Sequence, residues 1–334
     1  MTKALFPEWT KDVKSISLER ISGALTNAVF FVNTDNKKRM MMRVYGNGVD
    51  QFIDRENELT WLSRLSKFDL CPRLLGTFGN GRFEQYLNST TLTSETMRAP
   101  DTSKAIAGAL RQIHDIVAVY PPSEDTQMGV WLNINCWYKM VEEMIPRLMA
   151  RNENWAKVLK AKNLDNFADE IAECKRIAAD THSPTVFAHN DTQYGNLLRL
   201  EGSNELVTVD FEYASYNPRG FDICNHFCEW MYDYHAEDSA VLKRERYPTY
   251  EEQIRFLRAY IDSSSKFENP DMNDVDVTPE SLHKETLVYV MVDCLQWYLW
   301  GIIQTDKSEI DFDYFLFSIQ RLDAFREELA KWKA

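Results

Sequence analysis

The apolar positions in the first 90 residues occur in short runs, as they do in β-strands. Four such runs are apolar, aromatic or β-branched: residues 28–32, 40–45, 74–78 and 82–86. The last two flank Asn80-Gly81, the residue pair most typical of a β-hairpin turn. Between the two pairs of runs, residues 55–65 place leucines at helical spacing before Cys71-Pro72. With one strand ahead of residue 22, we expect the order strand, strand, strand, helix, strand, strand.

Beyond residue 88 the apolar positions recur every three or four residues, which predicts helices. The predicted helices span residues 105–114, 137–151, 167–179, 250–261, 282–303 and 315–332. Residues 185–216 interrupt this pattern with two short apolar runs. We therefore expect an α+β fold of two lobes: a small β-rich lobe over residues 1–88 and a larger, mainly helical lobe over residues 89–334. Residues 88–93 would form the hinge, with a cleft between the lobes.

Composition narrows the class of protein. A chain of 334 residues with 13% aromatic content is long enough for about two domains, and its composition is not that of a disordered chain. Its 38 basic and 51 acidic residues give a formal charge of −13, which argues against a nucleic-acid partner. The apolar stretch 287–303 contains Asp293 and Gln296 and is shorter than the about 20 residues of a membrane span. With no apolar signal segment, we expect a cytoplasmic protein with reduced thiols and no membrane insertion.

Two polar segments follow short apolar runs and carry the candidate chemistry. The first is His189-Asn-Asp191-Thr-Gln-Tyr-Gly-Asn196, and the second is Asp210-Phe-Glu212. Carboxylate and amide oxygens are the ligands that Mg²⁺ prefers. Asp191, with Asn196 five residues later and Asp210 nineteen residues later, has the spacing of a kinase site. In such a site the first Asp accepts the substrate proton, and the Asn and the second Asp hold metal.

These motifs carry a resemblance to a known family. Residues 189–196 resemble the catalytic loop of the choline/ethanolamine kinase family, and residues 210–234 (DFEYASYNPRGFDICNHFCEWMYDY) resemble its long signature almost throughout. The resemblance covers about residues 21–325 and is closest to choline kinases. It implies a bilobal protein-kinase-like fold, ATP as co-substrate, Mg²⁺, and phosphorylation of choline to phosphocholine, the first step of the CDP-choline route to phosphatidylcholine. It also implies homodimers.

The resemblance assigns roles to individual residues. Asp191 would be the catalytic base and contact the substrate, and Asn196, Asp210 and Glu212 would lie at the metal. The nucleotide side would comprise a short phosphate loop, a basic residue with an acidic partner, and two hinge residues: Ser22, Gly23, Thr26, Asn27, Arg43, Glu58, Gln85 and Leu87. A quaternary ammonium is recognised by aromatic faces and a carboxylate. The acceptor side would therefore comprise Tyr213, Glu229, Tyr234, Trp297, Trp300, Phe312, Tyr314 and Phe317.

Several alternatives stay open at this stage. Residues 44–48 and 54–58 resemble ethanolamine kinases more, and Phe317 stands where choline kinases often carry Tyr. An ethanolamine kinase is therefore the principal rival, ahead of an aminoglycoside-type phosphotransferase and a catalytically silent pseudokinase. A protein kinase is disfavoured because His-Arg-Asp, Asp-Phe-Gly and Ala-Pro-Glu are absent.

Three further residues or pairs have structural interpretations. We expect Asp222 to brace the catalytic loop, and His226 not to bind zinc because no H-E-x-x-H motif or Cys cluster accompanies it. Cys224 and Cys228 are predicted to be two buried side chains on one helix face.

Overall fold

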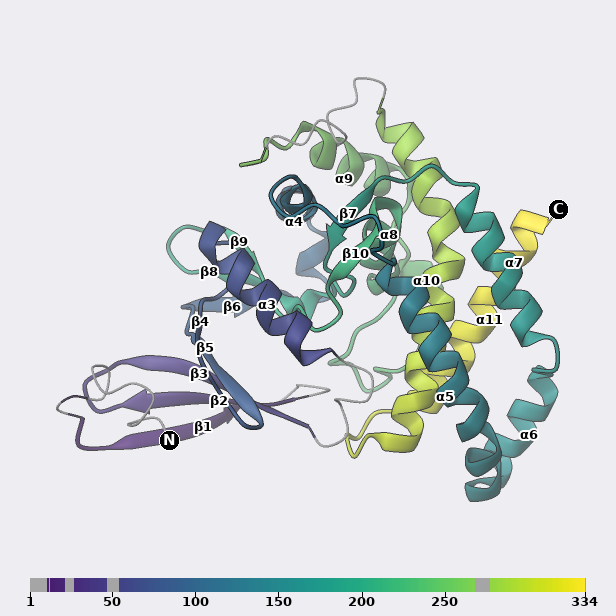
Figure 1. Ribbon diagram of the computed structural model, residues 1–334, viewed down its shortest axis with the longest axis horizontal. Helices are drawn as coiled ribbons and strands as arrows, with labels where there is room; N and C mark the ends of the chain where they lie inside the picture. The colour runs from purple at the N-terminus through teal and green to yellow at the C-terminus, as the bar shows by residue number, and fades with distance from the viewer. Residues whose placement is uncertain (1–10, 12, 22–26, 47–53, 268–276, 334) are drawn as a thin grey trace. The chain divides into compact units, whose positions relative to one another are not determined.

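The structure is a computed structural model that describes residues 11, 13–21, 27–46, 54–267 and 277–333 (Figure 1). The chain divides into two compact units. Unit 1 comprises residues 1–90 and 198–213, and unit 2 comprises residues 91–197 and 214–334. The boundary predicted after residue 88 lies two residues before the first break, but unit 1 also takes in residues 198–213, which the prediction assigned to the second lobe. The functional division into two lobes stays a prediction.

Unit 1 is built on an antiparallel sheet with the strand order β1-β2-β3-β5-β4. Its strands are β1 (Ile16–Ile21), β2 (Asn27–Thr34), β3 (Arg39–Tyr45), β4 (Leu74–Phe78) and β5 (Gly81–Gln85). Helix α3 (Arg55–Leu65) lies between β3 and β4 in the chain. This is the predicted order of elements, and the strand patterns explain it: Val32, Met40, Met42 and Phe83 form the buried apolar core of the sheet.

Local sequence signals fix the ends of these elements. Asp54 caps α3, because its side chain accepts a hydrogen bond from the Asn57 N–H at 3.0 Å. The predicted β4–β5 hairpin is present, but its two turn residues are Gly79 and Asn80, and Gly81 is the first residue of β5, paired with Phe78. A Cβ at Gly81 would lie 2.2 Å from the Arg43 carbonyl oxygen on β3, so only glycine lets the two strands approach this closely.

A second sheet, β6-β8-β9, comes from short strands close to the boundaries of the units. These strands are β6 (Ser89–Thr91), β8 (Leu197–Leu200) and β9 (Leu206–Thr208). In unit 2, β7 (Thr185–Ala188) pairs antiparallel with β10 (Ser215–Pro218). Short 3₁₀ turns complete the connections: η2 (Ser66–Phe68), η3 (Thr96–Arg98), η4 (Asp115–Ala118), η5 (Tyr194–Asn196) and η6 (Arg244–Arg246).

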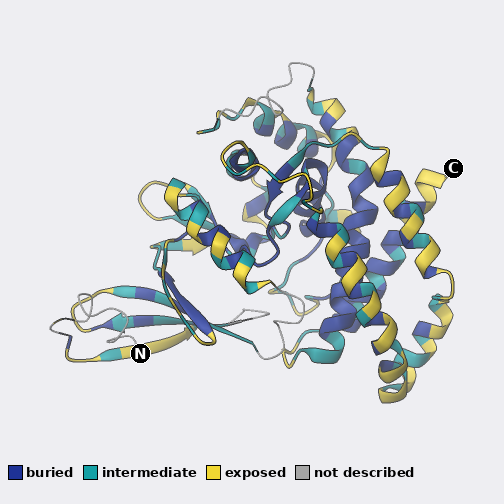
Figure 2. Cartoon of the chain, in the orientation of Figure 1, coloured by how far each residue is buried: buried dark blue, intermediate teal, exposed yellow. Residues whose placement is uncertain are grey.

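Unit 2 is otherwise helical, and one long buried helix organises it. Its helices are α4 (Pro100–His114), α5 (Gly129–Arg151), α6 (Glu153–Lys162), α7 (Phe167–Ala179), α8 (Arg219–Glu229), α9 (Tyr250–Asp262), α10 (Pro279–Lys307) and α11 (Tyr314–Lys333). α10 packs against α5, α8 and α11, and Figure 2 shows it buried over most of its length. α10 is the one described helix long and apolar enough to cross a membrane, and 89% of its apolar window is buried within the protein. Burial against the neighbouring helices accounts for its composition.

The predicted helices are present, with α4, α5 and α10 beginning earlier than expected. Two helices were not predicted. α6 is short and carries one buried residue, Leu159, so it has little periodic signal. All of α8 is buried, and only Cys224 and Cys228 were predicted to lie on a helix face there, as they do. The helical period was nevertheless present, because its polar residues recur every three or four positions: Arg219, Asp222, Asn225, His226 and Glu229.

Candidate functional site

The segment after β7 forms a tightly hydrogen-bonded loop in unit 2. β7 ends at Ala188, and Asp191 follows three residues later with a half-buried side chain. The Asn196 side-chain amide donates to the Asp191 carboxylate and to the Asp191 carbonyl oxygen, both at 2.9 Å. The Asp191 N–H donates to His189 Nδ1 at 3.3 Å. The sequence-predicted pair Asp191 and Asn196 is therefore in direct contact, and His189 braces the loop backbone.

Asp222 on α8 holds this loop from the inside of unit 2. Its carboxylate accepts hydrogen bonds from the backbone N–H groups of His189 (2.8 Å) and Asn190 (2.7 Å). His114 Nε2 lies 2.8 Å from the same carboxylate. Burial acts to raise the pKa of Asp222, but the contacts with His114 and His189 together outweigh it, and the pKa lies below its usual value. The predicted bracing role of Asp222 is confirmed.

The next turn of α8 holds Thr192, the residue after Asp191. Asn225 accepts a hydrogen bond from the Thr192 N–H at 3.0 Å, and His226 Nδ1 lies 3.0 Å from the Thr192 carbonyl oxygen. The indole N–H of Trp230 donates to His226 Nε2 at 3.2 Å. Both ring nitrogens of His226 are therefore engaged within the protein, and burial lowers its pKa to about 4. These contacts agree with the prediction that His226 binds no zinc.

Two residues of the candidate site have a left-handed backbone. Asn190 (φ 67°) precedes Asp191, and Asp210 (φ 68°) begins the second motif. The Asn190 side chain donates to Ser215 Oγ at 3.0 Å and accepts from the Asn217 side chain at 2.8 Å, which holds its unusual conformation in place. Non-glycine residues in this region of backbone space are uncommon and gather at functional sites.

In unit 1, Asp210 and Glu212 are the two ends of a chain of alternating charges. Arg43 Nη1 on β3 donates to Asp210 at 3.0 Å, and Arg43 Nε donates to Glu84 at 3.3 Å. Glu84 also pairs with Arg82 (2.6 Å). From Arg82 the chain continues to Glu58 (2.7 Å), Arg55 (2.8 Å) and Glu212 (3.2 Å). The network joins β3, β5 and α3 to the segment that carries the predicted metal-binding acids.

The network corrects the predicted pairing of Glu58 with Arg43. Glu58 was expected to pair with Arg43, but it pairs with Arg82 and Arg55 instead, and Glu84 takes the place beside Arg43. Arg43 is buried within this network and does not lie on the solvent face of the sheet. Burial would lower the pKa of Arg43, but Asp210 and Glu84 raise it above the usual value. Burial likewise opposes ionisation of Glu84, and its two arginines outweigh this and lower its pKa.

The remaining nucleotide-side residues are only partly described. Ser22, Gly23 and Thr26 lie outside the described residues, and Asn27 is the first residue of β2. The Gln85 N–H donates to the Arg73 carbonyl oxygen at 2.9 Å, and Ser89 Oγ donates to the Leu87 carbonyl oxygen at 3.2 Å. Gln85 therefore has its N–H engaged within unit 1, and the nucleotide contacts of Gln85 and Leu87 stay predictions.

Most of the predicted acceptor-side aromatic residues meet in unit 2. Trp297 and Trp300 on α10 pack at a ring-centroid distance of 5.3 Å, and Trp300 packs against Tyr314 (5.6 Å) and Phe317 (5.9 Å). Tyr232 joins the group by packing against Phe317 (5.0 Å). With further pairs at Phe312 and Tyr234, we call these residues the aromatic cluster: Tyr232, Tyr234, Trp297, Trp300, Phe312, Tyr314 and Phe317.

Glu229, at the end of α8, lies against this cluster. Tyr234 donates its hydroxyl hydrogen to Glu229 Oε2 at 2.7 Å, and Arg321 Nη2 on α11 donates to Oε1 at 3.1 Å. Burial raises the pKa of Glu229 to about 7, while Arg321 and Tyr234 act in the opposite direction. The loop of Asp191 reaches the cluster through Tyr194, whose ring lies 5.9 Å from that of Tyr234. Tyr213 belongs to unit 1, so it is not part of the cluster as described within unit 2.

The donor chemistry of the predicted metal residues fits a hard cation. Within the described ranges, no group of three or more His, Cys, Asp or Glu side chains has the arrangement of a protein-built metal site. Mg²⁺ does not require one, because it is usually held by one or two carboxylates together with phosphate oxygens and water. Asp210 and Asn196 carry oxygen donors of the required kind, and Asp210 is partly exposed, with 20% of its side-chain surface accessible.

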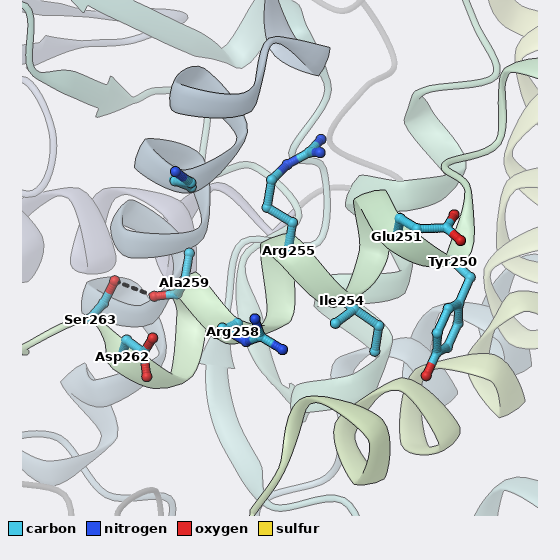
Figure 3. Close-up of a pocket in the computed structure, with 9 residues that line it drawn as sticks. Tyr250, Glu251, Ile254, Arg255, Arg258, Ala259, Asp262 and Ser263 are labelled. Atoms are coloured by element: carbon cyan, nitrogen blue, oxygen red, sulfur yellow. Dashed lines mark hydrogen bonds between the residues drawn. The ribbon is translucent and has the colours of Figure 1, made fainter.

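A surface groove of about 790 Å³ lies elsewhere in unit 2, between α4 and α9 (Figure 3). Apart from Lys104, its lining comes from α9 and the next residue, and it mixes both charges, including Glu251, Arg255, Arg258 and Asp262. None of the predicted site residues lines it. The groove therefore does not bear on the catalytic assignment.

Comparison with known proteins decides the family. The sequence profile of choline/ethanolamine kinase matches residues 18–326, close to the range 21–325 over which the motifs carry the resemblance. The chain is 33% identical over 330 residues to "Probable choline kinase 2" of Arabidopsis thaliana, covering 97% of this chain and 89% of that protein. The chain belongs to the choline/ethanolamine kinase family.

Other relatives in this family carry the second substrate in their names. The chain is 32% identical over 335 residues to "Probable ethanolamine kinase" of Arabidopsis thaliana, covering 98% of this chain and 84% of that protein. The solved structure of an ethanolamine kinase of Plasmodium vivax superposes with a TM-score of 0.81 at 23% identity, over 98% of this chain and 88% of that one. This superposition confirms the protein-kinase-like α+β fold.

Sequence reasoning about this family member missed the partners of its charged groups. The sequence analysis did not place five charged residues at the site: Arg55, Arg82 and Glu84 in unit 1, and Asp293 and Arg321 in unit 2. One signal was available for two of them. Asp293 interrupts the most apolar stretch of the chain, and a charge in a buried helix needs a partner of the opposite sign, here Arg321.

Proposed function

We propose that the chain transfers the γ-phosphoryl group of ATP to the hydroxyl of choline, giving phosphocholine and ADP. This is the first step of the CDP-choline route to phosphatidylcholine, and it makes the protein a choline kinase. The observation that carries the proposal is the buried carboxylate of Glu229 against the aromatic cluster, in the same unit as Asp191. A carboxylate beside aromatic faces is the chemistry that recognises a quaternary ammonium.

Choline fits this arrangement better than an ammonium group that donates hydrogen bonds. Each oxygen of Glu229 already accepts one hydrogen bond, from Arg321 and from Tyr234. A primary ammonium has three N–H donors to satisfy, whereas a quaternary ammonium has none and is attracted by charge and aromatic faces alone. Trp297, Trp300, Phe312, Tyr314 and Phe317 are the proposed binding surface for its methyl groups, and Tyr213 is proposed to contribute from unit 1.

Asp191 is proposed to orient the choline hydroxyl and accept its proton as the oxygen–phosphorus bond forms. The bond between the γ-phosphorus and the bridging oxygen breaks, and that oxygen leaves with ADP. Asn196 holds the Asp191 carboxylate at 2.9 Å, and Asp222 holds the backbone on its N-terminal side. Most of the rate enhancement in phosphoryl transfer comes from positioning and from charge stabilisation, so a rigidly held loop suits this chemistry.

The nucleotide is proposed to bind through unit 1. Arg43, which Glu84 and Asp210 hold in place, is the proposed phosphate-binding cation, and Glu58 supports it through Arg82. Ser22, Gly23, Thr26 and Asn27 are the proposed phosphate loop, and Gln85 and Leu87 the adenine contacts. Asn196, Asp210 and Glu212 are proposed to hold Mg²⁺, which would neutralise charge that develops on the phosphates.

We also propose the cytoplasm as the location and a homodimer as the assembly. The burial of α10 within unit 2 supports a protein without membrane insertion. The formal charge of −13 supports small-molecule substrates and not a nucleic-acid partner.

Ethanolamine is the principal alternative acceptor. The relative named as a probable ethanolamine kinase is 32% identical, nearly as similar as the choline kinase relative at 33%. The aromatic cluster also lacks a hydroxyl at Phe317, where choline kinases often carry Tyr. An enzyme that accepts both substrates is consistent with both observations.

The test is ADP release measured by a coupled assay with Mg·ATP and with choline or ethanolamine as acceptor. Reactions without acceptor and with an aminoglycoside serve as controls. We expect acceptor-dependent ADP release with a higher kcat/KM for choline. A higher value for ethanolamine would replace the proposed substrate. Nucleotide binding by folded protein without acceptor-dependent release would overturn the proposed activity in favour of a pseudokinase.

A further inference from the structure

Glu229 belongs to a buried triad of charges that joins three helices of unit 2. Arg321 on α11 is fully buried and donates from Nη1 to Asp293 on α10 at 2.7 Å and from Nη2 to Glu229 on α8 at 3.1 Å. Two acids therefore share one cation. When both acids are ionised, the triad carries one surplus negative charge in the interior of the protein.

Asp293 has the hydrogen bonds of a carboxylate anion. Besides Arg321, it accepts hydrogen bonds from the Asn225 side chain at 3.0 Å and from the Trp297 indole N–H at 3.1 Å. A carboxylate that accepts three hydrogen bonds and donates none needs no proton of its own. Asp293 thus takes up the positive charge of Arg321, and Glu229 is the acid whose charge is left over.

The surplus charge lies beside aromatic faces. The Arg321 guanidinium carbon is 4.8 Å from the centre of the Tyr232 ring and 5.3 Å from that of Phe317, both in the aromatic cluster. Tyr234, which donates to Glu229, stacks on Tyr232 at 5.5 Å. Arg321 and the aromatic cluster are thus in contact, so removing Asp293 would leave a neutral Arg321–Glu229 pair against those rings.

We propose that Asp293 is a specificity-determining residue for the cationic acceptor: it neutralises Arg321, so that the negative charge of Glu229 is not balanced within the protein and is left for the ammonium group. Asp293 acts as a positioning residue, through Arg321, and is not proposed to touch the acceptor. This inference rests on the proposed phosphorylation of choline. It adds that the preference for a cation depends on the net charge of Glu229, Asp293 and Arg321, which lie on three helices, and not on Glu229 alone.

The test compares choline with its uncharged carbon isostere, 3,3-dimethylbutan-1-ol, as acceptors of the full chain. In Asp293→Asn, we expect kcat/KM for choline to fall about tenfold because one negative charge near the ammonium group is lost, and kcat/KM for the isostere to change by less than about twofold. The matched control is Asp323→Asn, which removes an acid from α11 whose partner is Lys162. It should change neither value. An equal loss for both acceptors, or no loss for choline, overturns the proposal.

A second variant covers the case in which Asp293→Asn does not fold. In Asp293→Asn/Arg321→Gln the two charges are removed together, which a protein interior tolerates better than an unpaired charge. Glu229 then carries the single negative charge alone, so the ratio of choline to isostere kcat/KM should return to within about threefold of the wild type, because the charge count is again one negative. A ratio that stays lowered overturns the proposal.

Binding separates a failure of this inference from a failure of the proposed function. Tetramethylammonium carries the cationic head without the hydroxyl, and calorimetry measures its affinity without any turnover. If the wild type binds it and Asp293→Asn binds it about tenfold more weakly, equivalent to about 1.4 kcal/mol, the charge count holds even where choline is not phosphorylated. Equal binding to both proteins contradicts the inference while leaving choline phosphorylation intact.

Discussion

Removing Asp222 should uncouple the catalytic loop from α8. The Asp222 side chain is fully buried and accepts hydrogen bonds from two backbone N–H groups of the loop at 2.7 and 2.8 Å, and it lies 2.8 Å from His114. Each hydrogen bond to a buried charge contributes about 1.5–3 kcal/mol, and removal of one partner from a buried charged pair costs about 3–5 kcal/mol. Since these contributions overlap, we expect Asp222→Ala to lose about 3–5 kcal/mol of folding free energy.

That loss is smaller than the total stability of most proteins, about 5–15 kcal/mol, so the variant should remain folded at low temperature. Its Tm should fall by about 5–10 °C. The loop that carries Asp191 loses the acceptors of two N–H groups, and a displacement of about 1 Å at a reacting group costs about a hundredfold in rate. We therefore expect kcat with choline to fall about a hundredfold, with KM for ATP changed much less.

The pH dependence of stability gives an independent check. Because the pKa of Asp222 is lowered in the folded state, its contribution is fully present above the unfolded value of about 3.9 and is lost as the pH falls through the folded value. The difference in Tm between the wild type and Asp222→Asn should therefore be largest near neutral pH and shrink in acid. Asp222→Asn keeps one acceptor oxygen and should lie between the wild type and Asp222→Ala.

The matched control is Glu285→Gln, which breaks a buried ion pair with Arg219 at 2.5 Å at the start of α8. It should lower Tm and leave kcat close to the wild-type value, because Glu285 pairs with Arg219 and Ser183, outside residues 189–196. The reasoning fails if Asp222→Ala loses less than about 1 kcal/mol. It also fails if Tm falls in both variants and kcat is kept in both.

Four further predictions follow from the proposed roles. Asp191→Ala should abolish kcat while ATP affinity, measured by calorimetry, is retained; normal turnover would remove Asp191 from the mechanism. Asp210→Ala should weaken Mg·ATP as well, since it removes an oxygen donor and leaves Arg43 with Glu84 alone, and unchanged Mg·ATP affinity would argue against the metal assignment. Trp300→Ala should raise KM for choline about tenfold or more through lost cation–π contact, with little change in KM for ATP; equal changes would point to general damage. Finally, burial raises the pKa of Glu229 to about 7, among the charged and titratable groups Arg321, Asp293, Tyr194, Tyr232 and Tyr234. KM for choline should therefore fall as the pH rises from 6 to 8 and Glu229 ionises. A KM that does not change with pH, or one that changes equally for the neutral isostere, would contradict this.

Local pattern was enough to predict the five-stranded sheet and α3 of unit 1, but not the short strands β6 and β8 or the pairing of its charges. The five strands, the β4–β5 hairpin and α3 follow from alternation and turn chemistry within a few residues. The pairing depends on register: Arg43 lies directly opposite Arg82 in the β3–β5 pair. Two adjacent guanidinium groups repel, and Glu84 separates them by contacting both. Glu58 then pairs with Arg82. This pairing could not be predicted from the sequence without knowing the register of the β3–β5 pair.

In unit 2 the aromatic residues were predictable from the family motif, whereas their supporting charges were not. Asp293 and Arg321 are 28 residues apart on different helices and meet only because α10 and α11 pack together. Tyr232 was missed although its neighbour Tyr234 was named, because nothing in the sequence distinguishes two tyrosines on one segment. The full span of α8 was not predicted, although its polar residues have helical spacing, because they lie within the family motif and were interpreted as site residues.

The two networks of buried charge follow the same rule. In unit 1, four acids share three arginines, from Asp210 to Glu212, and in unit 2 two acids share Arg321. Each network therefore has one negative charge in excess. In unit 1 the excess lies next to the residues proposed to bind Mg²⁺, and in unit 2 it lies next to those proposed to bind an ammonium group. Buried charges are costly unless they are paired, so an unbalanced count persists where a ligand of the opposite sign completes it. The formal charge of −13 says nothing about this, because most of those charges are on the surface. The sign of the ligand is set by the few buried acids for which the protein supplies no cation of its own.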